Sequence, residues 1–359
     1  MTPQFNRLTI KNLRRETADA VSIAFDVPAE LAERYRFTPG EYLTLRSTIQ
    51  GRDVRRCYSI SSGLDDNELR VTVKKVADGL FSSFASTDLA PGRSIDVMTP
   101  MGSFTAPIEP NKRKVYVAFA AGSGITPIMS ILRTVLVREP HSTFTLFYGN
   151  RSTNSIIFRH ALEDLKDIFL ERLSVFHTLS RETMDVPLFS GRLNAEKLRL
   201  FAESFFDPKQ VDHAFLCGPG DMVNGLRDAL IDLGVASHLI HQERFTPSDG
   251  ALPTTVPARR APVPAEGAEV VAVLNGTARL FRMGSESATI VDAAHENGIE
   301  VPYSCKGGMC CTCRAKLIEG EVSMDANYSL EPWELEAGYI LTCQARPTSS
   351  KVVIDYDHL

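Results

Sequence analysis

"YSCKGGMCCTCRAKL", residues 303–317, contains four of the seven cysteines of a 359-residue chain. Cys305, Cys310 and Cys313 have the spacing C-x4-C-x2-C, and Cys343 supplies a fourth thiol further along the chain. This is the plant-type [2Fe-2S] spacing, whereas a structural zinc site more often shows two C-x2-C pairs. The pattern therefore predicts that these four cysteines hold a [2Fe-2S] cluster.

The other three cysteines are expected to be packing residues. Cys311 lies inside the quoted stretch, but using it in place of Cys310 would give spacings that match neither cluster nor zinc. Cys57 and Cys217 lie far from the stretch in sequence. We therefore predict a small buried side chain at Cys311 and packing roles for the other two.

The composition indicates a multidomain soluble protein. A chain of 359 residues is too long for one typical core and predicts two or three domains. The net charge of -5 is ordinary for a globular protein and argues against non-specific nucleic-acid binding. The first residues show no uninterrupted apolar stretch, so we predict a cytoplasmic protein without a membrane anchor. Clustered cysteines in a reducing compartment favour metal over disulfides.

The region before the cysteine stretch has two clear local signals. "AEVVAVLNGTARLFRM", residues 268–283, has two alternating apolar runs joined by Asn275-Gly276, which predicts a hairpin. "TIVDAAHENGI", residues 289–299, predicts a helix that ends at Gly298. This order resembles the plant-type ferredoxin domain, which implies an α+β (β-grasp) fold over residues 268–359.

A one-electron cluster does not accept hydride, so a pyridine nucleotide donor would require a flavin between them. "RRCYSISS", residues 55–62, contains an R-x-Y-S motif on a predicted strand. "VKKVADGLFSSFA", residues 73–85, begins a helix after Gly79, and "MTPMGSF" follows at 98–104. The ordered set resembles the flavin domain of the ferredoxin-NADP reductase family, which implies an antiparallel β-barrel over residues 1–108.

The resemblance implies a role for each motif residue. Tyr58 would lie against the isoalloxazine ring and Ser59 near its N5, with Arg56 on the diphosphate. Gly79 and Ser82 would line that diphosphate at the helix start, which favours FAD over FMN. Without the resemblance, Arg56 would be a surface charge and Tyr58 a half-buried strand aromatic.

"KVYVAFAAGSGITPIMSILRTVL", residues 114–136, is a buried-strand run that breaks at Gly122 and Gly124 and continues as a helix. The G-x-G-x-x-G fingerprint is absent. The variant resembles the pyridine-nucleotide lobe of the same family, which implies that Gly122, Gly124 and Thr126 meet the cofactor phosphates. Further alternation of strands and helices predicts an α/β domain with a parallel sheet over residues 109–246.

"HAFLCGPGDMVNGLRDAL", residues 213–230, repeats the plan of strand, glycine turn and helix. The resemblance assigns four residues to the nicotinamide side of the nucleotide: Cys217, Gly218, Pro219 and Gly220. The two glycines could instead serve only to reverse the chain. Glu243, in the segment that closes the lobe, is expected to be a proton partner near the flavin. The alternative is a local ion pair with Arg244.

"VFHTLSRET", residues 175–183, predicts the preferred donor. Ser180 and Arg181 match the pair that binds the adenosine 2′-phosphate in NADP-using members of the family, and Arg151 adds a second cation. Glu182 would weaken the local positive potential, and the pair could simply begin a solvated loop. We therefore predict NADPH, with NADH as a possible donor.

"PSDGALPTTVPARRAPVPAEG", residues 247–267, is rich in proline and small residues and predicts a linker. The whole order resembles the reductase components of bacterial multicomponent oxygenases. Within that group the C-terminal segment most resembles reductases that serve the di-iron phenylacetyl-CoA epoxidase of phenylacetate catabolism. The resemblance implies electron transfer from NADPH through FAD and the cluster to an oxygenase. A Rieske-type or steroid hydroxylase partner is the alternative, and a flavin and iron-sulfur redox sensor is a third hypothesis.

Overall fold

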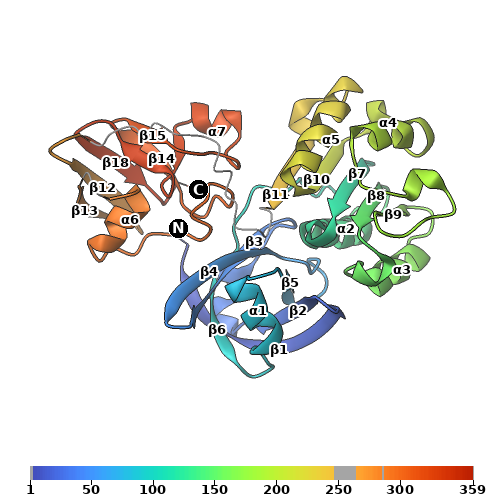
Figure 1. The fold of residues 1–359 in the computed structure, drawn as a ribbon, viewed down its shortest axis with the longest axis horizontal. Coiled ribbons are helices and arrows are strands. Elements are labelled where there is room, and N and C mark those ends of the chain that lie inside the picture. Colours follow the sequence, from blue (N-terminus) through green and yellow to red (C-terminus); the bar gives the residue numbers. More distant parts are fainter. Residues whose placement is uncertain (1–2, 246–263, 285–286, 359) are drawn as a thin grey trace.

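The computed structural model describes residues 3–245, 264–284 and 287–358. Figure 1 shows three lobes, with the N-terminal lobe below and the other two side by side above it. Most of the predicted linker at 247–267 lies outside the described residues. The predicted fold class, an antiparallel flavin barrel with a parallel α/β lobe and a ferredoxin domain, is confirmed.

The first lobe is an antiparallel barrel. Its strands in spatial order are β4 (Arg52–Ser59), β3 (Tyr42–Ile49), β6 (Ser94–Met98), β1 (Phe5–Thr17), β2 (Ala20–Asp26) and β5 (Leu69–Lys74). A bridge between Ile60 and Val71 joins the two edges, which closes the sheet. Helix α1 (Leu80–Thr87) packs Phe81 and Ala85 into the barrel core, and the 3-10 helix η1 (Ala29–Tyr35) lies before β3.

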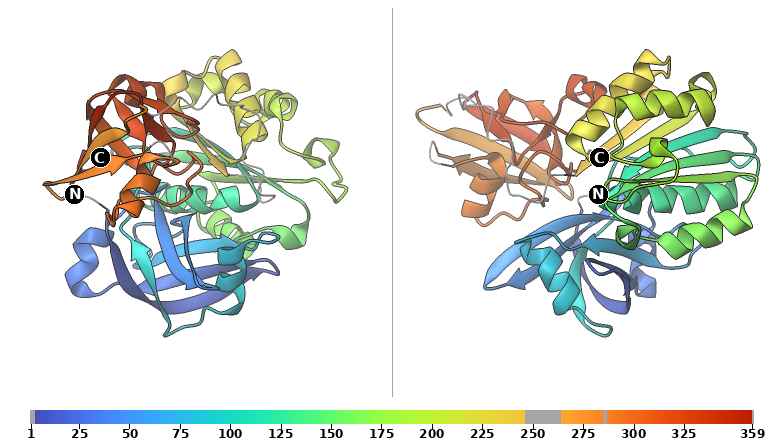
Figure 2. Two further views of the ribbon diagram at one scale, coloured as in Figure 1. Left: turned by 60° about the vertical axis from the view of Figure 1, so that its left-hand side comes forward. Right: turned by 45° about the vertical axis from the view of Figure 1, so that its right-hand side comes forward.

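The second lobe is a parallel sheet between two layers of helices, as the right view of Figure 2 shows. Its strands in spatial order are β11 (Ile240–Phe245), β10 (His213–Pro219), β7 (Val115–Ala121), β8 (Thr143–Asn150) and β9 (Leu173–Leu179). Helices α2 (Ile125–Arg138) and α3 (Arg159–Ile168) share one apolar core, and α4 (Ala195–Ser204) and α5 (Gly220–Asp232) share the other. The strand order reverses between β7 and β10, and open α/β sheets bind ligands at such a point.

Short 3-10 helices connect these elements: η2 (Gly122–Gly124), η3 (Thr153–Ser155), η4 (Pro187–Phe189), η5 (Pro208–Gln210) and η6 (Ser237–Leu239). η2 follows β7 directly and leads into α2, so the glycine loop lies at the carboxyl end of the central strand. Since all the strands are parallel, the loops after β8, β9 and β10 meet at the same edge.

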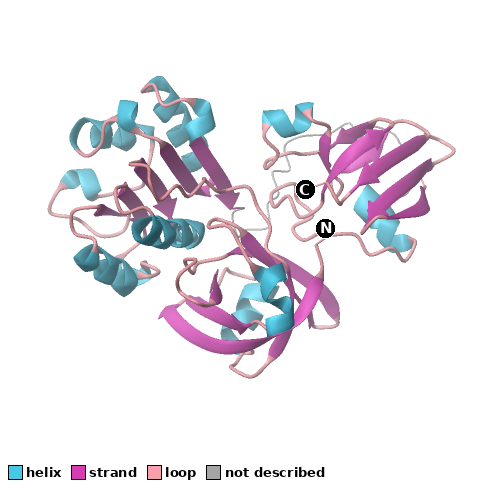
Figure 3. Cartoon of the chain, turned by 180° about the vertical axis from the view of Figure 1, so that it is seen from behind, coloured by secondary structure: helices cyan, strands magenta, loops and turns pink. Residues whose placement is uncertain are grey.

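The third lobe is a mixed sheet with one main helix, seen from behind in Figure 3. Its strands in spatial order are β13 (Thr277–Met283), β12 (Ala268–Leu274), β18 (Lys351–Asp355), β14 (Arg314–Glu319) and β16 (Tyr339–Leu341). The remaining elements are α6 (Ile290–Glu296), α7 (Pro332–Glu336) and the pair β15 (Val322–Met324) and β17 (Ala345–Pro347). Asn275 and Gly276 both have positive φ, as a two-residue hairpin turn requires, so the predicted hairpin is confirmed.

No helix within the described ranges is both long and apolar enough to span a membrane.

Candidate functional site

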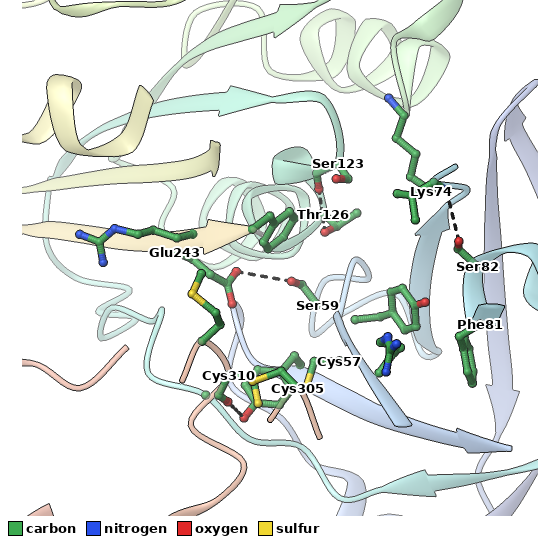
Figure 4. A pocket seen from close by; sticks show the side chains of 18 of the residues that line it. Cys57, Ser59, Lys74, Phe81, Ser82, Ser123, Thr126, Glu243, Cys305 and Cys310 are labelled. Carbon is green, nitrogen blue, oxygen red and sulfur yellow. Dashed lines mark hydrogen bonds between the residues drawn. The ribbon is translucent and has the colours of Figure 1, made fainter. Parts of the chain in front are cut away.

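A cavity of about 840 Å³ lies where the three lobes meet (Figure 4). The barrel contributes Tyr58, the parallel lobe contributes Thr126 and Glu243, and the ferredoxin lobe contributes Cys305 and Cys310. Residues predicted to contact the flavin, the nucleotide and the cluster therefore line one continuous space.

The R-x-Y-S motif lies at the end of β4 on the cavity wall. Arg56 is exposed, and its guanidinium donates a 2.7 Å hydrogen bond to the carbonyl of Arg55. The Tyr58 ring lies 5.6 Å from the ring of Phe81 on α1, measured between centroids. Burial raises the pKa of Tyr58 well above its usual range, so its hydroxyl is neutral at physiological pH. A flat neutral aromatic ring suits contact with an isoalloxazine face.

Gly79 is the N-cap of α1, and the Ser82 hydroxyl lies one turn into the helix. The hydroxyl accepts a 3.2 Å bond from the Val76 N–H and donates a 3.2 Å bond to the Gly79 carbonyl. The first N–H groups of a helix have no partner within the helix and favour anions. With Arg56 on the same cavity wall, this donor set fits a diphosphate.

Glu243 on β11 points towards the end of β4 (Figure 4). Its carboxylate lies 3.5 Å from the Ser59 hydroxyl and 3.8 Å from the Cys217 thiol, both of which can donate to it. Burial raises the pKa of Glu243 to about 7, although these two hydrogen bonds lower it. Burial and the nearby carboxylate raise the pKa of Cys217, so that thiol stays neutral. The alternative, an ion pair with Arg244, is not seen among the described residues; Arg244 instead contacts Asn224 and Gln242.

The glycine loop and the end of β10 touch at the point where the strand order reverses. A Cβ added at Gly124 would lie 2.2 Å from the Cys217 carbonyl oxygen, so only glycine fits there. Thr126 is buried and its hydroxyl donates to the Ser123 carbonyl at 3.0 Å. Gly122 has φ +54 and accepts a hydrogen bond from Tyr148. This places the predicted phosphate loop beside the predicted nicotinamide segment, Cys217, Gly218, Pro219 and Gly220.

The predicted 2′-phosphate residues lie together at the carboxyl ends of β8 and β9. The Arg181 N–H donates to the Arg151 carbonyl at 2.8 Å, and Ser180, Arg181 and Arg151 are all exposed. Glu182 does not contact either arginine in the described contacts; it accepts bonds from the N–H and hydroxyl of Thr153 at 2.9 and 2.6 Å. These bonds fix the position of the Glu182 carboxylate, but they do not remove its negative charge.

The four predicted cluster ligands converge in the ferredoxin lobe. Hydrogen bonds from the Cys310 and Cys343 thiols hold the pKa of Cys305 well below its usual range, and Cys313 contacts Cys343. The Cys305 sulfur also accepts a 3.3 Å bond from the Gly307 N–H. Among the described residues, no three potential ligands converge on a single ion. A [2Fe-2S] cluster takes two thiolates on each of two irons, and the four thiols match that number, with Cys305 in contact with Cys310 and Cys313 in contact with Cys343.

Cys311 and Cys57 differ in their surroundings. Cys311 has φ +50 and packs against the ferredoxin core, and burial raises its pKa to about 12. Cys57 lies at the contact between two lobes, where its sulfur is 3.4 Å from the Thr44 hydroxyl and 3.5 Å from that of Thr312. Its packing therefore joins the flavin strand to the cluster loop, a position its sequence spacing does not indicate.

Several other residues of the cavity wall were not predicted from the sequence. Tyr42, Thr72 and Lys74 line it from β3 and β5. A Cβ added at Gly122 would lie 3.7 Å from Lys74 Nζ, so this cation reaches the phosphate loop of the neighbouring lobe. Tyr42 pairs with Ser59 in the strand register, which is the signal that could have placed it once the pairing was known.

Three family profiles match the chain. They describe an oxidoreductase FAD-binding domain at residues 7–106, an oxidoreductase NAD-binding domain at 119–228 and a 2Fe-2S iron-sulfur cluster binding domain at 273–348. The chain therefore carries domains for FAD, for a pyridine nucleotide and for a [2Fe-2S] cluster.

Similar proteins share this whole arrangement. The chain is 43% identical to one of the subunits of 1,2-phenylacetyl-CoA epoxidase from Escherichia coli, over 98% of each chain. It is 35% identical to the ferredoxin reductase component of 3-ketosteroid-9-alpha-monooxygenase from Rhodococcus rhodochrous, over 97% of this chain and 96% of that protein. The solved structure of phthalate dioxygenase reductase has the same fold, with a TM-score of 0.59, 23% identity and 98% of each chain covered.

Proposed function

Because this chain belongs to the family of flavin and [2Fe-2S] reductases that serve oxygenases, we propose that it delivers electrons from NADPH to a di-iron phenylacetyl-CoA epoxidase. One observation gives the strongest support to electron transfer from flavin to cluster within the chain. The flavin motif at Tyr58, the carboxyl of Glu243 and the cluster loop at Cys310 line a single cavity. The predicted flavin and cluster sites therefore lie next to each other, which supports direct electron transfer between them.

We assign the lobes as residues 1–108 for FAD, 109–246 for the nucleotide and 268–359 for the cluster. When bound, the flavin takes a hydride and passes electrons singly, and the cluster carries them outwards. The chain holds the two groups in fixed positions. Arg56, Ser82 and the start of α1 bind the diphosphate, while Tyr58 supports the ring. Cys305, Cys310, Cys313 and Cys343 bind the irons.

Glu243 has a distinct role in this scheme. A hydride carries two electrons and one proton, so one proton must be released once both electrons have been passed on, one at a time, through the one-electron cluster. The carboxylate of Glu243 accepts this proton through the Ser59 hydroxyl, which lies 3.5 Å away. A group with a pKa of about 7 can both take and release a proton near neutral pH.

This role gives a pH prediction. The pKa of Glu243 is raised to about 7, so its proton-accepting carboxylate is present above that pH and lost below it. NADPH-driven cytochrome c reduction should therefore rise with pH through about 7 in the wild type. In Glu243→Gln the rate should be lower by about tenfold or more and flat with pH. A profile in Glu243→Gln with the same midpoint would assign the ionisation to another group.

The choice of NADPH rests on Ser180, Arg181 and Arg151, which form an exposed polar and cationic edge. A guanidinium and a hydroxyl suit a dianionic 2′-phosphate. Glu182 accepts two hydrogen bonds from Thr153 and makes no ion pair with either arginine in the described contacts.

Replacing Arg181 with alanine should raise the Michaelis constant for NADPH by about tenfold, or ~1.4 kcal/mol, and leave that for NADH nearly unchanged. Steady-state kinetics with both donors measures this. Arg199→Ala is the matched control, because Arg199 is also exposed but pairs with Asp232 between α4 and α5. Equal losses with both donors would make Arg181 structural, and a wild type that prefers NADH would overturn the choice of donor.

The choice of acceptor is tested by reconstitution. Purified epoxidase subunits should convert phenylacetyl-CoA with NADPH only when this chain is added. If cytochrome c is reduced but the epoxidase stays inactive, the acceptor is another oxygenase, such as a Rieske-type or steroid hydroxylase. If neither acceptor is reduced, the chain is a redox sensor rather than a reductase.

A further inference from the structure

The ferredoxin lobe is joined to the barrel by a charged contact outside the predicted cofactor sites. Glu300 lies in the segment between α6 and the cluster loop. Its carboxylate lies 2.7 Å from Arg46 Nη1 and 3.2 Å from Arg55 Nη2. Both arginines belong to barrel strands, β3 and β4, so this contact crosses between lobes.

Arg55 is the more buried of the two arginines in this contact. Its side chain is only 5% exposed, and its Nη2 also lies 2.9 Å from an Asp53 carboxylate oxygen. Its guanidinium carbon lies 4.1 Å from the ring centre of Tyr303, which begins the cysteine stretch. A buried cation depends on its partners, because an unpaired one is costly to desolvate. Arg55 therefore holds Glu300 and Tyr303 together from the barrel side.

The centre of the interface is neutral. The Tyr42 hydroxyl donates to the Cys310 carbonyl and lies 3.0 Å from the Thr312 hydroxyl. On another side of the ferredoxin lobe, the charged Arg244 of the nucleotide lobe donates to the neutral Tyr328 carbonyl at 2.9 Å. Neutral contacts give a close fit, but they act only at short range, whereas the charges at Glu300 also act before contact is made.

We propose that Glu300, held by Arg46 and Arg55, is a positioning residue that docks the cluster loop against the flavin strand for internal electron transfer. This rests on the proposed function, since it requires electrons to pass from flavin to cluster. In that step the reduced flavin loses one electron and one ferric iron becomes ferrous, with no bond formed or broken. The rate of such a step falls steeply with distance, so docking determines it.

The exposure of Glu300 makes the docking sensitive to salt. Its side chain is 64% exposed and that of Arg46 is 24% exposed, so dissolved ions reach the pair. The Debye length falls from about 10 Å at 0.1 M salt to about 3 Å at 1 M, which weakens such a contact. Raising the salt concentration should therefore weaken the docking of the ferredoxin lobe on the barrel.

The first test is rapid-mixing spectroscopy of the holo-protein with NADPH. Glu300→Arg places a second guanidinium beside the buried Arg55 and should slow cluster reduction by about tenfold or more. Flavin reduction by NADPH should stay unchanged, because Glu300 does not line the cavity. Glu300→Asp should keep most of the rate. Glu319→Arg is the matched control, since Glu319 is an exposed ferredoxin-lobe carboxylate whose partner, Lys351, lies in the same lobe.

The second test is independent of turnover. Small-angle X-ray scattering at low salt should give a larger radius of gyration for Glu300→Arg than for the wild type or Glu319→Arg. The wild type should expand only as salt is raised, and Glu300→Gln should lose most of this dependence. Arg46→Gln, which alters the barrel side of the pair, should slow cluster reduction in the same direction.

A wild-type radius together with a wild-type rate in Glu300→Arg would overturn the proposal. Slower flavin reduction in that variant would also contradict it, because the defect would then lie at the flavin site. If NADPH reduces the wild-type flavin but never the cluster, the proposed function fails instead. The scattering comparison alone would then decide whether Glu300 docks the lobe.

Discussion

Replacing Cys310 with serine will remove the visible iron-sulfur absorption almost completely, whereas the same change at Cys311 will leave it nearly intact. The Cys310 thiol lies in contact with Cys305, and its loss would leave one iron with a single protein thiolate instead of two. Cys311 instead packs against the ferredoxin core beside Ser329. Absorption spectra and iron analysis of both purified variants measure this difference.

The two cysteines are neighbours in sequence, so each variant is the matched control of the other. Flavin absorption should be retained in both, because neither change touches α1 or the diphosphate residues. A Cys311→Ser protein that lacks the iron-sulfur absorption, together with a Cys310→Ser protein that keeps it, would show that the ligand register is wrong by one residue.

Replacing Gly124 with alanine should raise the Michaelis constant for NADPH by about a hundredfold, or ~2.7 kcal/mol. The added Cβ would lie 2.2 Å from the Cys217 carbonyl oxygen and 2.6 Å from its carbon. These are backbone atoms at the end of β10, so they cannot move aside as a flexible side chain would. Relief of the clash must therefore separate the phosphate loop from the nicotinamide segment.

Gly225→Ala is the control for this change. Gly225 lies within α5, and a Cβ added there meets nothing within 4 Å. Alanine is also the better helix former, so stability should stay the same or rise. If Gly124→Ala binds NADPH normally, the close approach of the two loops does not matter for the nucleotide site. Thermal unfolding of both variants separates loss of binding from loss of folding.

The ferredoxin fold could be predicted from the sequence because its signals are local. Asn275-Gly276 predicts a tight turn whatever surrounds it, and the structure has the hairpin there. The spacing of Cys305, Cys310 and Cys313 is typical of one short loop wrapped round a cluster, and their role as ligands stays a prediction. The order of strands and helices around the Gly122 loop likewise predicted the parallel sheet.

The position of the ferredoxin lobe could not be predicted. Its contacts join residues distant in sequence through common residue types, such as Glu300 with Arg46 and Tyr42 with Thr312. None of these side chains, considered on its own strand or loop, indicates a contact with another lobe. A proline-rich linker also sets only an upper limit on distance, so many placements are compatible with it.

The contacts that Lys74 and Cys57 make with other lobes could not be predicted, for a related reason. Lys74 lies at the end of a barrel strand, where a lysine is ordinarily a solvated charge, yet it reaches the Gly122 loop of another lobe. Cys57 sits between the motif residues Arg56 and Tyr58 but faces Thr312 of the ferredoxin lobe. The role of such residues depends on which lobe packs against them, and the sequence does not carry that information locally.

The most direct test of electron transfer within this chain is an anaerobic rapid-mixing experiment in which NADPH is added to the holo-protein. The flavin absorption should fall first, the cluster absorption should fall afterwards, and frozen samples should give the paramagnetic signal of a reduced [2Fe-2S] cluster. Cys310→Ser should show only the first phase. A wild-type protein whose flavin is reduced while its cluster remains oxidised would contradict the account.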